Sequence, residues 1–279
     1  MPEPPPGTKP PAPAPWRRGL ELRGVSFTYP GSERPVLREL SFAIRPGQAV
    51  ALVGENGAGK TTLVKLLARL YDPTEGEILV DGTDLRAYDL GSWRRRLAVV
   101  FQDFVRFNLP ARENIGLGQV QHVEDLALVQ AAAERGGAAP LIACLPLGYD
   151  TMLGRRFAAA GHDGVDLSGG EWQKVALARA FMRALPSLPE EAGAQLLILD
   201  EPTAALDARA EHDLFLRFRE LTRGRATLLI SHRFSTVKLA DRIVVLEQGR
   251  IIEAGTHAEL LALGGTYADL YEKQAARYR

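Results

Sequence analysis

The stretch Gly54-Glu55-Asn56-Gly57-Ala58-Gly59-Lys60-Thr61 decides the fold of this chain. Its glycines let the backbone come close to a phosphate group, and its successive N–H groups form an anion cradle at a helix start. In this pattern the lysine, Lys60, reaches the β- and γ-phosphates of a nucleotide, and the hydroxyl of Thr61 binds Mg²⁺. The alternative interpretation is an ordinary glycine-rich turn.

The sequence on either side of this stretch favours the phosphate-binding interpretation. Residues 49–53 form an apolar run typical of a buried parallel strand. After the loop, leucines recur at helical spacing from Leu63 to Leu70. Strand, loop and helix in this order are the context that a phosphate-binding loop requires. We therefore predict that the ATP-binding residues of the loop are Gly54, Glu55, Asn56, Gly57, Ala58, Gly59, Lys60, Thr61 and Thr62.

A second apolar run ends in two carboxylates. Residues 196–199 are all aliphatic and are followed by Asp200 and Glu201. Ligands of open α/β sheets bind at the carboxyl ends of the strands, so these side chains are predicted to face the same ligand. Asp200 can hold Mg²⁺ through its water shell, and Glu201 can polarise an attacking water. Taken alone, two acids after a strand are also a common signal of a helix start.

A third motif, Leu167-Ser168-Gly169-Gly170-Glu171, opens a helical pattern. A small polar residue and two glycines before a helix predict a second anion-binding helix N-terminus. Ser168 followed three residues later by Glu171 is also a capping box. The two interpretations are compatible.

The rest of the chain reads as an α/β core with an inserted helical lobe. Residues 1–15 hold eight of the 18 prolines, so residues 1–18 are predicted to be a disordered arm or linker. Residues from about 103 to 185 are rich in Ala and Leu and form the predicted lobe. Further strands are expected near 22–27, 36–44, 228–230, 243–246 and 251–252, and further helices near 208–222 and 267–274.

Composition excludes several classes of protein. The 279 residues carry 34 basic and 34 acidic side chains, which argues against a broad basic field for nucleic acid. Cys144 is the only cysteine, so neither an intrachain disulfide nor a cysteine-based zinc site can form. No apolar run is long enough to span a membrane, and the start lacks the pattern of a secretory signal.

The three motifs, in this order and spacing, resemble the ATP-binding cassette (ABC) family over about residues 20–275. The resemblance implies an α/β fold, with a RecA-like P-loop NTPase core, an antiparallel β subdomain and an inserted α-helical subdomain. The ATPase domain would span residues 19–279. It also implies that one site is built from two chains, each of which binds ATP and Mg²⁺.

The resemblance extends to residues outside the three motifs. Tyr29 looks like the aromatic that stacks on adenine, Gln102 like the glutamine that reaches Mg²⁺, and His232 like the histidine that contacts the γ-phosphate. The implied catalytic residues are Glu201, His232 and Gln102, and the implied Mg²⁺ residues are Thr61, Gln102 and Asp200. The residues implied to act in trans across the dimer are Ser168, Gly169, Gly170 and Asp207.

The end of the chain resembles exporter-type members of the family, in the stretch from Gly255 to Tyr267. The resemblance implies an ATPase that powers export through a transmembrane domain, at the cytoplasmic face of the cell membrane. A second nucleotide-binding domain, identical or not, would complete the dimer. One alternative is a soluble ABC ATPase acting in translation or DNA maintenance, which usually carries two cassettes. Another is a P-loop enzyme of a different family, such as a kinase, which would leave the Ser168 motif unexplained.

Overall fold

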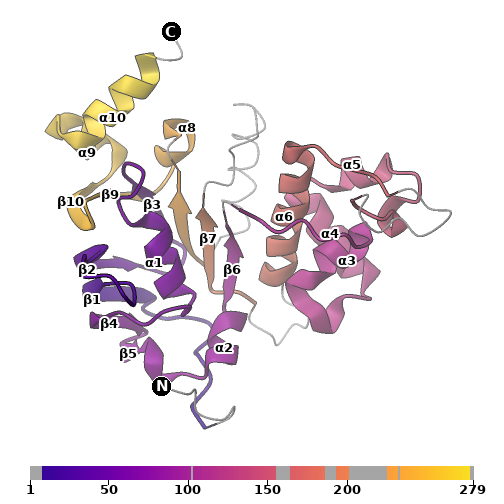
Figure 1. The fold of residues 1–279 in the computed structure, drawn as a ribbon, viewed down its shortest axis with the longest axis horizontal. Helices are drawn as coiled ribbons and strands as arrows, with labels where there is room; N and C mark the ends of the chain where they lie inside the picture. The colour runs from indigo at the N-terminus through magenta and orange to yellow at the C-terminus, as the bar shows by residue number, and fades with distance from the viewer. Residues whose placement is uncertain are drawn as a thin grey trace. The chain divides into compact units, whose positions relative to one another are not determined.

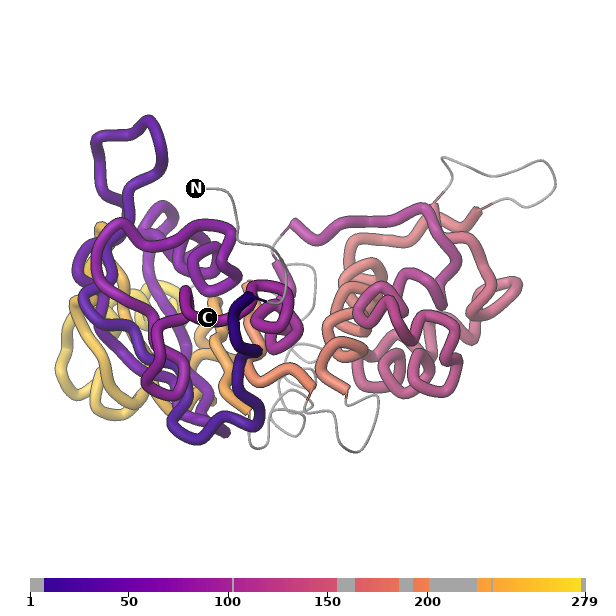
Figure 2. Tube along the Cα trace, turned by 90° about the horizontal axis from the view of Figure 1, so that it is seen from below, coloured from indigo at the N-terminus to yellow at the C-terminus, as the bar shows by residue number. Residues whose placement is uncertain are grey.

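The computed structural model describes residues 8–101, 103–154, 164–185, 193–200, 225–231 and 233–276. These residues form two compact units, and each is described by itself. The first comprises residues 8–97, 195–200, 225–231 and 233–276, and the second comprises the described residues between 98 and 194. Figure 2 shows that both ends of the chain, indigo and yellow, contribute to the first unit.

A six-stranded sheet organises the nucleotide-binding side of the fold (Figure 1). β3 pairs in parallel with β8 and β9, and β7 pairs in parallel with β8. The strands of this sheet are, in spatial order, β10 (Arg250–Gly255), β9 (Arg242–Glu247), β3 (Ala49–Val53), β8 (Ala226–Ile230), β7 (Leu196–Asp200) and β6 (Leu97–Val100). The aliphatic runs that predicted β3, β7 and β8 are buried, as expected for strands covered on both faces.

A second, four-stranded sheet is antiparallel where β1 meets β2 and β4. Its strands are β2 (Leu37–Ile44), β1 (Leu20–Phe27), β4 (Glu75–Val80) and β5 (Thr83–Asp84) in spatial order. The predicted α/β fold with an additional antiparallel sheet is therefore confirmed.

Short helices complete the first unit. They are α1 (Lys60–Leu67), η1 (Leu85–Ala87), α2 (Leu90–Arg95), α8 (Phe234–Val237), α9 (His257–Leu263) and α10 (Thr266–Ala275). The C-terminal helices close a hydrophobic core over the sheet, in which Tyr267 of α10 meets Phe234 of α8 and Val53 of β3. The periodicity near 267–274 thus marks a helix that packs on the nucleotide-binding sheet.

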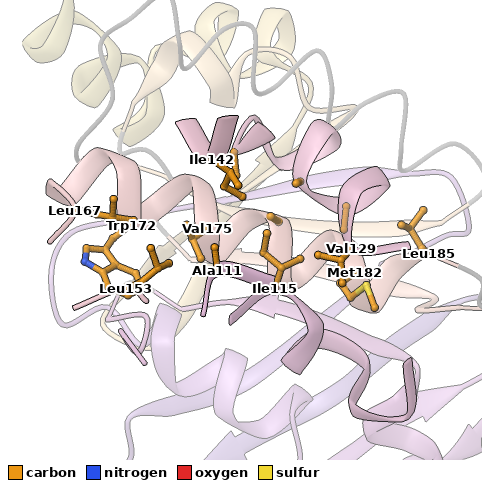
Figure 3. Close-up of a cluster of buried hydrophobic side chains, with 14 residues drawn as sticks. Ala111, Ile115, Val129, Ile142, Leu153, Leu167, Trp172, Val175, Met182 and Leu185 are labelled. Carbon is orange, nitrogen blue, oxygen red and sulfur yellow. The ribbon is translucent and has the colours of Figure 1, made fainter. Parts of the chain in front are cut away.

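The second unit is helical. Its described elements are α3 (Ala111–Gly116), η2 (Leu117–His122), α4 (Leu126–Gly136), α5 (Ala139–Ala143), η3 (Gly148–Asp150) and α6 (Gly169–Ala184). One buried cluster joins α6 to α3, α4 and α5 (Figure 3). The predicted lobe of residues 103–185 falls within this unit.

The structure differs from the sequence-based expectation at the N-terminal arm. Residues 8–18, expected to be disordered, lie against the first unit, with Ala12 and Trp16 buried. The prolines made this segment look like a plain linker, but Trp16 gives it a large apolar anchor. Residues 1–7 and the helix expected near 208–222 lie outside the described residues. Among the helices that are described, none is long and apolar enough to cross a bilayer.

Candidate nucleotide site

The loop of residues 54–59 has a backbone that requires glycine at two positions. Gly59, directly before α1, has φ of 106°, and a Cβ built there would lie 2.5 Å from the Cδ2 atom of Leu37. Gly54 packs so closely on the carbonyl oxygen of Leu246 that a Cβ would collide with it. The loop is therefore held between the start of β2 and the end of β9, in the turn between β3 and α1 (Figure 1).

Lys60 bridges this loop. Its side chain is only 8% exposed, and its Nζ atom donates hydrogen bonds to the carbonyl oxygens of Gly54 at 2.8 Å and Glu55 at 2.9 Å. A buried ammonium group is costly unless oxygen acceptors surround it. The two carbonyls fix the ammonium group beside the loop backbone, and a phosphate oxygen could also accept its hydrogen bonds.

The start of α1 is open to an anion. Gly59 is its N-cap residue and has no side chain to accept a hydrogen bond from the first-turn N–H groups. These N–H groups and the positive end of the helix dipole favour a negative charge at this point. The geometry therefore supports phosphate binding rather than an ordinary glycine-rich turn.

Tyr29 lies beside the loop, although 33 residues separate it from Thr62. Its hydroxyl is 3.1 Å from the Oγ1 atom of Thr62, and Lys65 Nζ donates to it at 3.4 Å. The ring packs edge-on against Phe27 and Tyr71, at centroid distances of 4.9 Å and 5.4 Å. The structure thus brings together Tyr29 and the loop, as the resemblance predicted, while the contact of Tyr29 with adenine stays a prediction.

Asp200 ends β7 at the same edge of the sheet. β7 and β3 are both parallel to β8, which lies between them. Two strand spacings amount to about 10 Å, a span that a nucleotide phosphate and its hydrated metal can bridge. The Asp200 side chain is 2% exposed, so the protein rather than solvent sets its orientation.

Sequence reasoning missed Ser231, which follows β8 at this edge. Its Oγ atom accepts a hydrogen bond from the Arg233 backbone at 3.0 Å and lies 3.3 Å from Thr236 Oγ1. Ser231 is buried. The signal that could have identified it is its place directly after an aliphatic strand.

Four predicted site residues lie outside the described residues: Gln102, Glu201, Asp207 and His232. The described members of the predicted set in the first unit are therefore Tyr29, the loop from Gly54 to Thr62, and Asp200.

In the second unit, the Ser168 motif forms the start of α6. Glu171 N donates to Ser168 Oγ at 3.4 Å, and Ser168 N donates to Glu171 Oε2 at 2.7 Å. The side chain of Ser168, and then its backbone N–H, hydrogen-bond to the Glu171 carboxylate and lower the pKa of that group, because they stabilise its ionised form. The capping box predicted from the sequence is therefore present.

The same helix start is also exposed. Ser168 and Gly169 face solvent, whereas the flanking Leu167 and Trp172 are buried in the cluster of Figure 3. The Ser168 hydroxyl also hydrogen-bonds to the Glu171 carboxylate within the capping box. The apolar neighbours hold an exposed donor group in a fixed position.

The donors at the loop suit Mg²⁺ better than a transition metal. Within the described residues, no group of three or more Asp, Glu, His or Cys side chains surrounds a common point. Mg²⁺ prefers hard oxygen ligands and keeps several of its waters, with one or two protein ligands and substrate phosphates. The Thr61 hydroxyl and the Asp200 carboxylate fit that requirement.

The glycine loop, its lysine and the strand ending in Asp200 define a P-loop NTPase domain. A family model described as ABC transporter matches residues 37–204. The chain belongs to the ABC transporter family, and it has the ATPase domain of the exporter type.

Several known proteins are similar over nearly the whole chain. An "ATP-dependent lipid A-core flippase" of Burkholderia orbicola (strain AU 1054) is 46% identical over 264 residues, which cover 93% of this chain and 41% of that protein. The protein of the same name in Dechloromonas aromatica (strain RCB) is 46% identical over 257 residues, or 92% of this chain and 41% of its own. A solved structure of a bacterial Atm1-family ABC exporter with ATP bound matches with a TM-score of 0.83 and 40% identity, over 96% of this chain and 44% of that one. The chain thus spans about two-fifths of the length of these curated relatives.

Proposed function

We propose that this ATPase domain powers an exporter, and that its working form is a dimer coupled to a transmembrane domain. The position of Lys60, held 2.8 Å and 2.9 Å from two carbonyl oxygens of the loop, is the observation that carries the ATP-binding part of this proposal, and the similarity to full-length exporters supports the rest. The Lys60 ammonium group exchanges those carbonyls for the β- and γ-phosphates when ATP enters, which replaces neutral acceptors with charged ones.

The remaining roles are assigned around this group. Tyr29 stacks on adenine, and the N–H groups from Gly54 to Thr62 surround the phosphates. Thr61, Asp200 and Gln102 would hold Mg²⁺, which would neutralise negative charge on the nucleotide phosphates. Glu201 orients and polarises the attacking water, and His232 contacts the γ-phosphate.

The second copy completes the site. The exposed helix start at Ser168, Gly169 and Gly170 presents N–H groups and a hydroxyl to a γ-phosphate held by the partner, and Asp207 lies across the same interface. Exposure of Ser168 and Gly169 in the single chain supports this arrangement. ATP that contacts both copies stabilises the dimer by mass action, and its hydrolysis removes that stabilisation. A membrane domain can convert the resulting two states into inward- and outward-facing forms.

The similarity to full-length exporters, of which this chain spans about two-fifths, supports a transmembrane partner beyond this sequence. That partner would hold the domain at the cytoplasmic face of the cell membrane. Cargo recognition is assigned to that membrane domain. Co-purification of the tagged protein with a polytopic membrane domain tests this arrangement, and recovery with ribosomes or DNA instead would contradict it.

Substitution of Lys60 tests the catalytic assignment. Lys60→Ala is expected to lower the rate of ATP hydrolysis by about 100-fold or more, the loss typical of one preorganised electrostatic contact to a transition state. Lys273→Ala, which makes the same change on the exposed face of α10, is the matched control and should leave the rate unchanged. Wild-type turnover by Lys60→Ala would overturn the assigned site.

A further inference from the structure

We propose that residues 9–18, here called the strap, connect to the end of α1 and the start of β7. These two elements carry Lys60 and Asp200 of the nucleotide site at their opposite ends. In this proposal Trp16 is a positioning residue for α1 and β7, and nucleotide binding and strap docking influence each other. The coupling part of the inference rests on the proposed function, whereas the docking part does not.

The strap contacts the first turn of α2 through its backbone. Asp89 N donates to the carbonyl oxygen of Pro10 at 2.9 Å. Ala12 N donates to Ser92 Oγ at 2.8 Å, and the side chain of Ala12 is buried. The strap thereby satisfies the N-cap residue of α2, Asp89, as well as one of its own backbone groups.

An aromatic pair provides the main apolar contact. Trp16 stacks on Trp93 of α2, with ring centroids 5.9 Å apart and an interplanar angle of 3°. Trp93 is fully buried and Trp16 is only 5% exposed. Burial of so large a side chain stabilises the docked position of a segment whose other apolar residues are only prolines and alanines.

The strap is also fixed where it enters β1. The backbone N–H groups of Arg17, Arg18 and Gly19 all donate to the carboxylate of Asp81, at 2.7–3.1 Å. Asp81 N in turn donates to Gly19 O at 2.9 Å. The strap is therefore held at both ends, and its prolines limit the number of conformations it loses on docking.

The strap is connected to α1 indirectly, through Trp93, and to the start of β7 directly, through one hydrogen bond. Trp93 Nε1 donates to the carbonyl oxygen of Leu67, the last residue of α1, at 2.9 Å. Trp16 N donates to Gln195 Oε1 at 3.2 Å, and Gln195 directly precedes β7. α1 begins at Lys60 and β7 ends at Asp200. Because a helix and a buried strand move as units, a shift of the strap is transmitted to both site residues.

Docking is tested first, without nucleotide, on the full chain. Trypsin can cleave after Arg17 and Arg18 only when the strap leaves Asp81 and Trp93. Trp16→Ala is expected to accelerate this cleavage by about 10-fold, the effect of losing one large buried contact. Trp16→Phe should restore most of the protection, and Ser92→Ala, a milder change, should give an intermediate rate. Leu263→Ala, at an exposed position of α9, is the control and should have no effect. Equal cleavage rates in Trp16→Ala and the parent chain would overturn docking.

Coupling is tested by reciprocity. If docking changes the affinity for ATP by a given factor, ATP must change docking by the same factor. Mg–ATP should therefore change the tryptic cleavage rate of the parent chain, and Trp16→Ala should change the Kd for ATP by a matching factor. A docked strap with no effect of ATP on cleavage and an unchanged Kd would overturn the coupling. Failure of the parent chain to bind ATP would instead contradict the proposed function, and the docking result would stand.

Discussion

The hydrogen bonds of Lys60 position its ammonium group before a charged ligand binds. An ammonium group buried without hydrogen-bond acceptors would destabilise the fold. Lys60 avoids this because the carbonyl oxygens of Gly54 and Glu55 accept its hydrogen bonds. The same hydrogen bonds order the side chain in advance, so little further side-chain ordering is required when phosphate arrives.

His257 gives the C-terminal core a pH dependence. Its Nδ1 atom is 2.7 Å from the hydroxyl of Tyr267, and its ring packs edge-on against that of Tyr267. Burial, and to a smaller degree the charge of Lys238, lowers the pKa of His257 below its ordinary value of 6.5. The unfolded chain then binds this proton more readily than the folded one, so stability falls as the pH drops below 6.5 and the loss is complete below the folded pKa.

We therefore expect the melting temperature to fall between pH 7.5 and pH 5.5 by more in the parent chain than in His257→Gln. Thermal unfolding followed by circular dichroism at both pH values measures this difference. Equal decreases in the two proteins would show that His257 does not contribute to the pH dependence.

Among the helices, α6 and α9 begin with the same capping motif. Ser168 and Glu171 form a capping box at α6, and Thr256 and Glu259 form one at α9. Loss of such a cap costs about 1 kcal/mol. The two helices differ in assigned function, because only α6 is proposed to meet a γ-phosphate in trans.

This pair provides a matched test of the Ser168 motif. Ser168→Ala and Thr256→Ala should each lower the free energy of unfolding by about 1 kcal/mol, measured by urea denaturation. Only Ser168→Ala should also reduce ATP hydrolysis, by about 10-fold or more, because it alone removes a donor near the transferred phosphate. Similar hydrolysis rates in both variants would leave Ser168 with a capping role alone.

The sequence predicted the strands and helices that are determined by residues close together in the chain. Aliphatic runs identified β3, β7 and β8, and the Ser168–Glu171 spacing identified the start of α6. The docked strap was missed because its contacts join residues about 80 positions apart, such as Ala12 and Ser92. The proline content of the strap indicates a stiff segment, but it does not reveal that Trp16 packs on Trp93.

The site was predictable to the extent that its motifs are contiguous. The loop at Gly54 to Thr62 and Asp200 could be predicted from the residues themselves, since each follows a buried strand. The position of Tyr29 followed only from the resemblance, because nothing local connects it to Thr62. Ser231 was missed because a serine after a strand has no distinctive pattern. The roles of Gln102, Glu201, Asp207 and His232 stay predictions.

At the scale of the whole molecule, the nucleotide loop and the Ser168 helix start belong to different units of the chain. Each unit has its own hydrophobic core, one around Tyr267 and Phe234 and the other around Trp172. In the proposed cycle, the nucleotide loop of one copy meets the Ser168 helix start of a second copy and separates from it after hydrolysis. The proposed function therefore depends on ATP joining two copies.

The most direct test is the mass of the Glu201→Gln variant in solution with and without Mg–ATP, measured by light scattering after size-exclusion chromatography. The substitution keeps the shape of the side chain but removes the carboxylate proposed to polarise water, so ATP should stay bound and uncleaved. We predict a monomer without nucleotide and a dimer with Mg–ATP, and we predict that adding Ser168→Ala weakens the dimer. A variant that binds ATP yet stays strictly monomeric, with its membrane domain also supplied, would contradict the account.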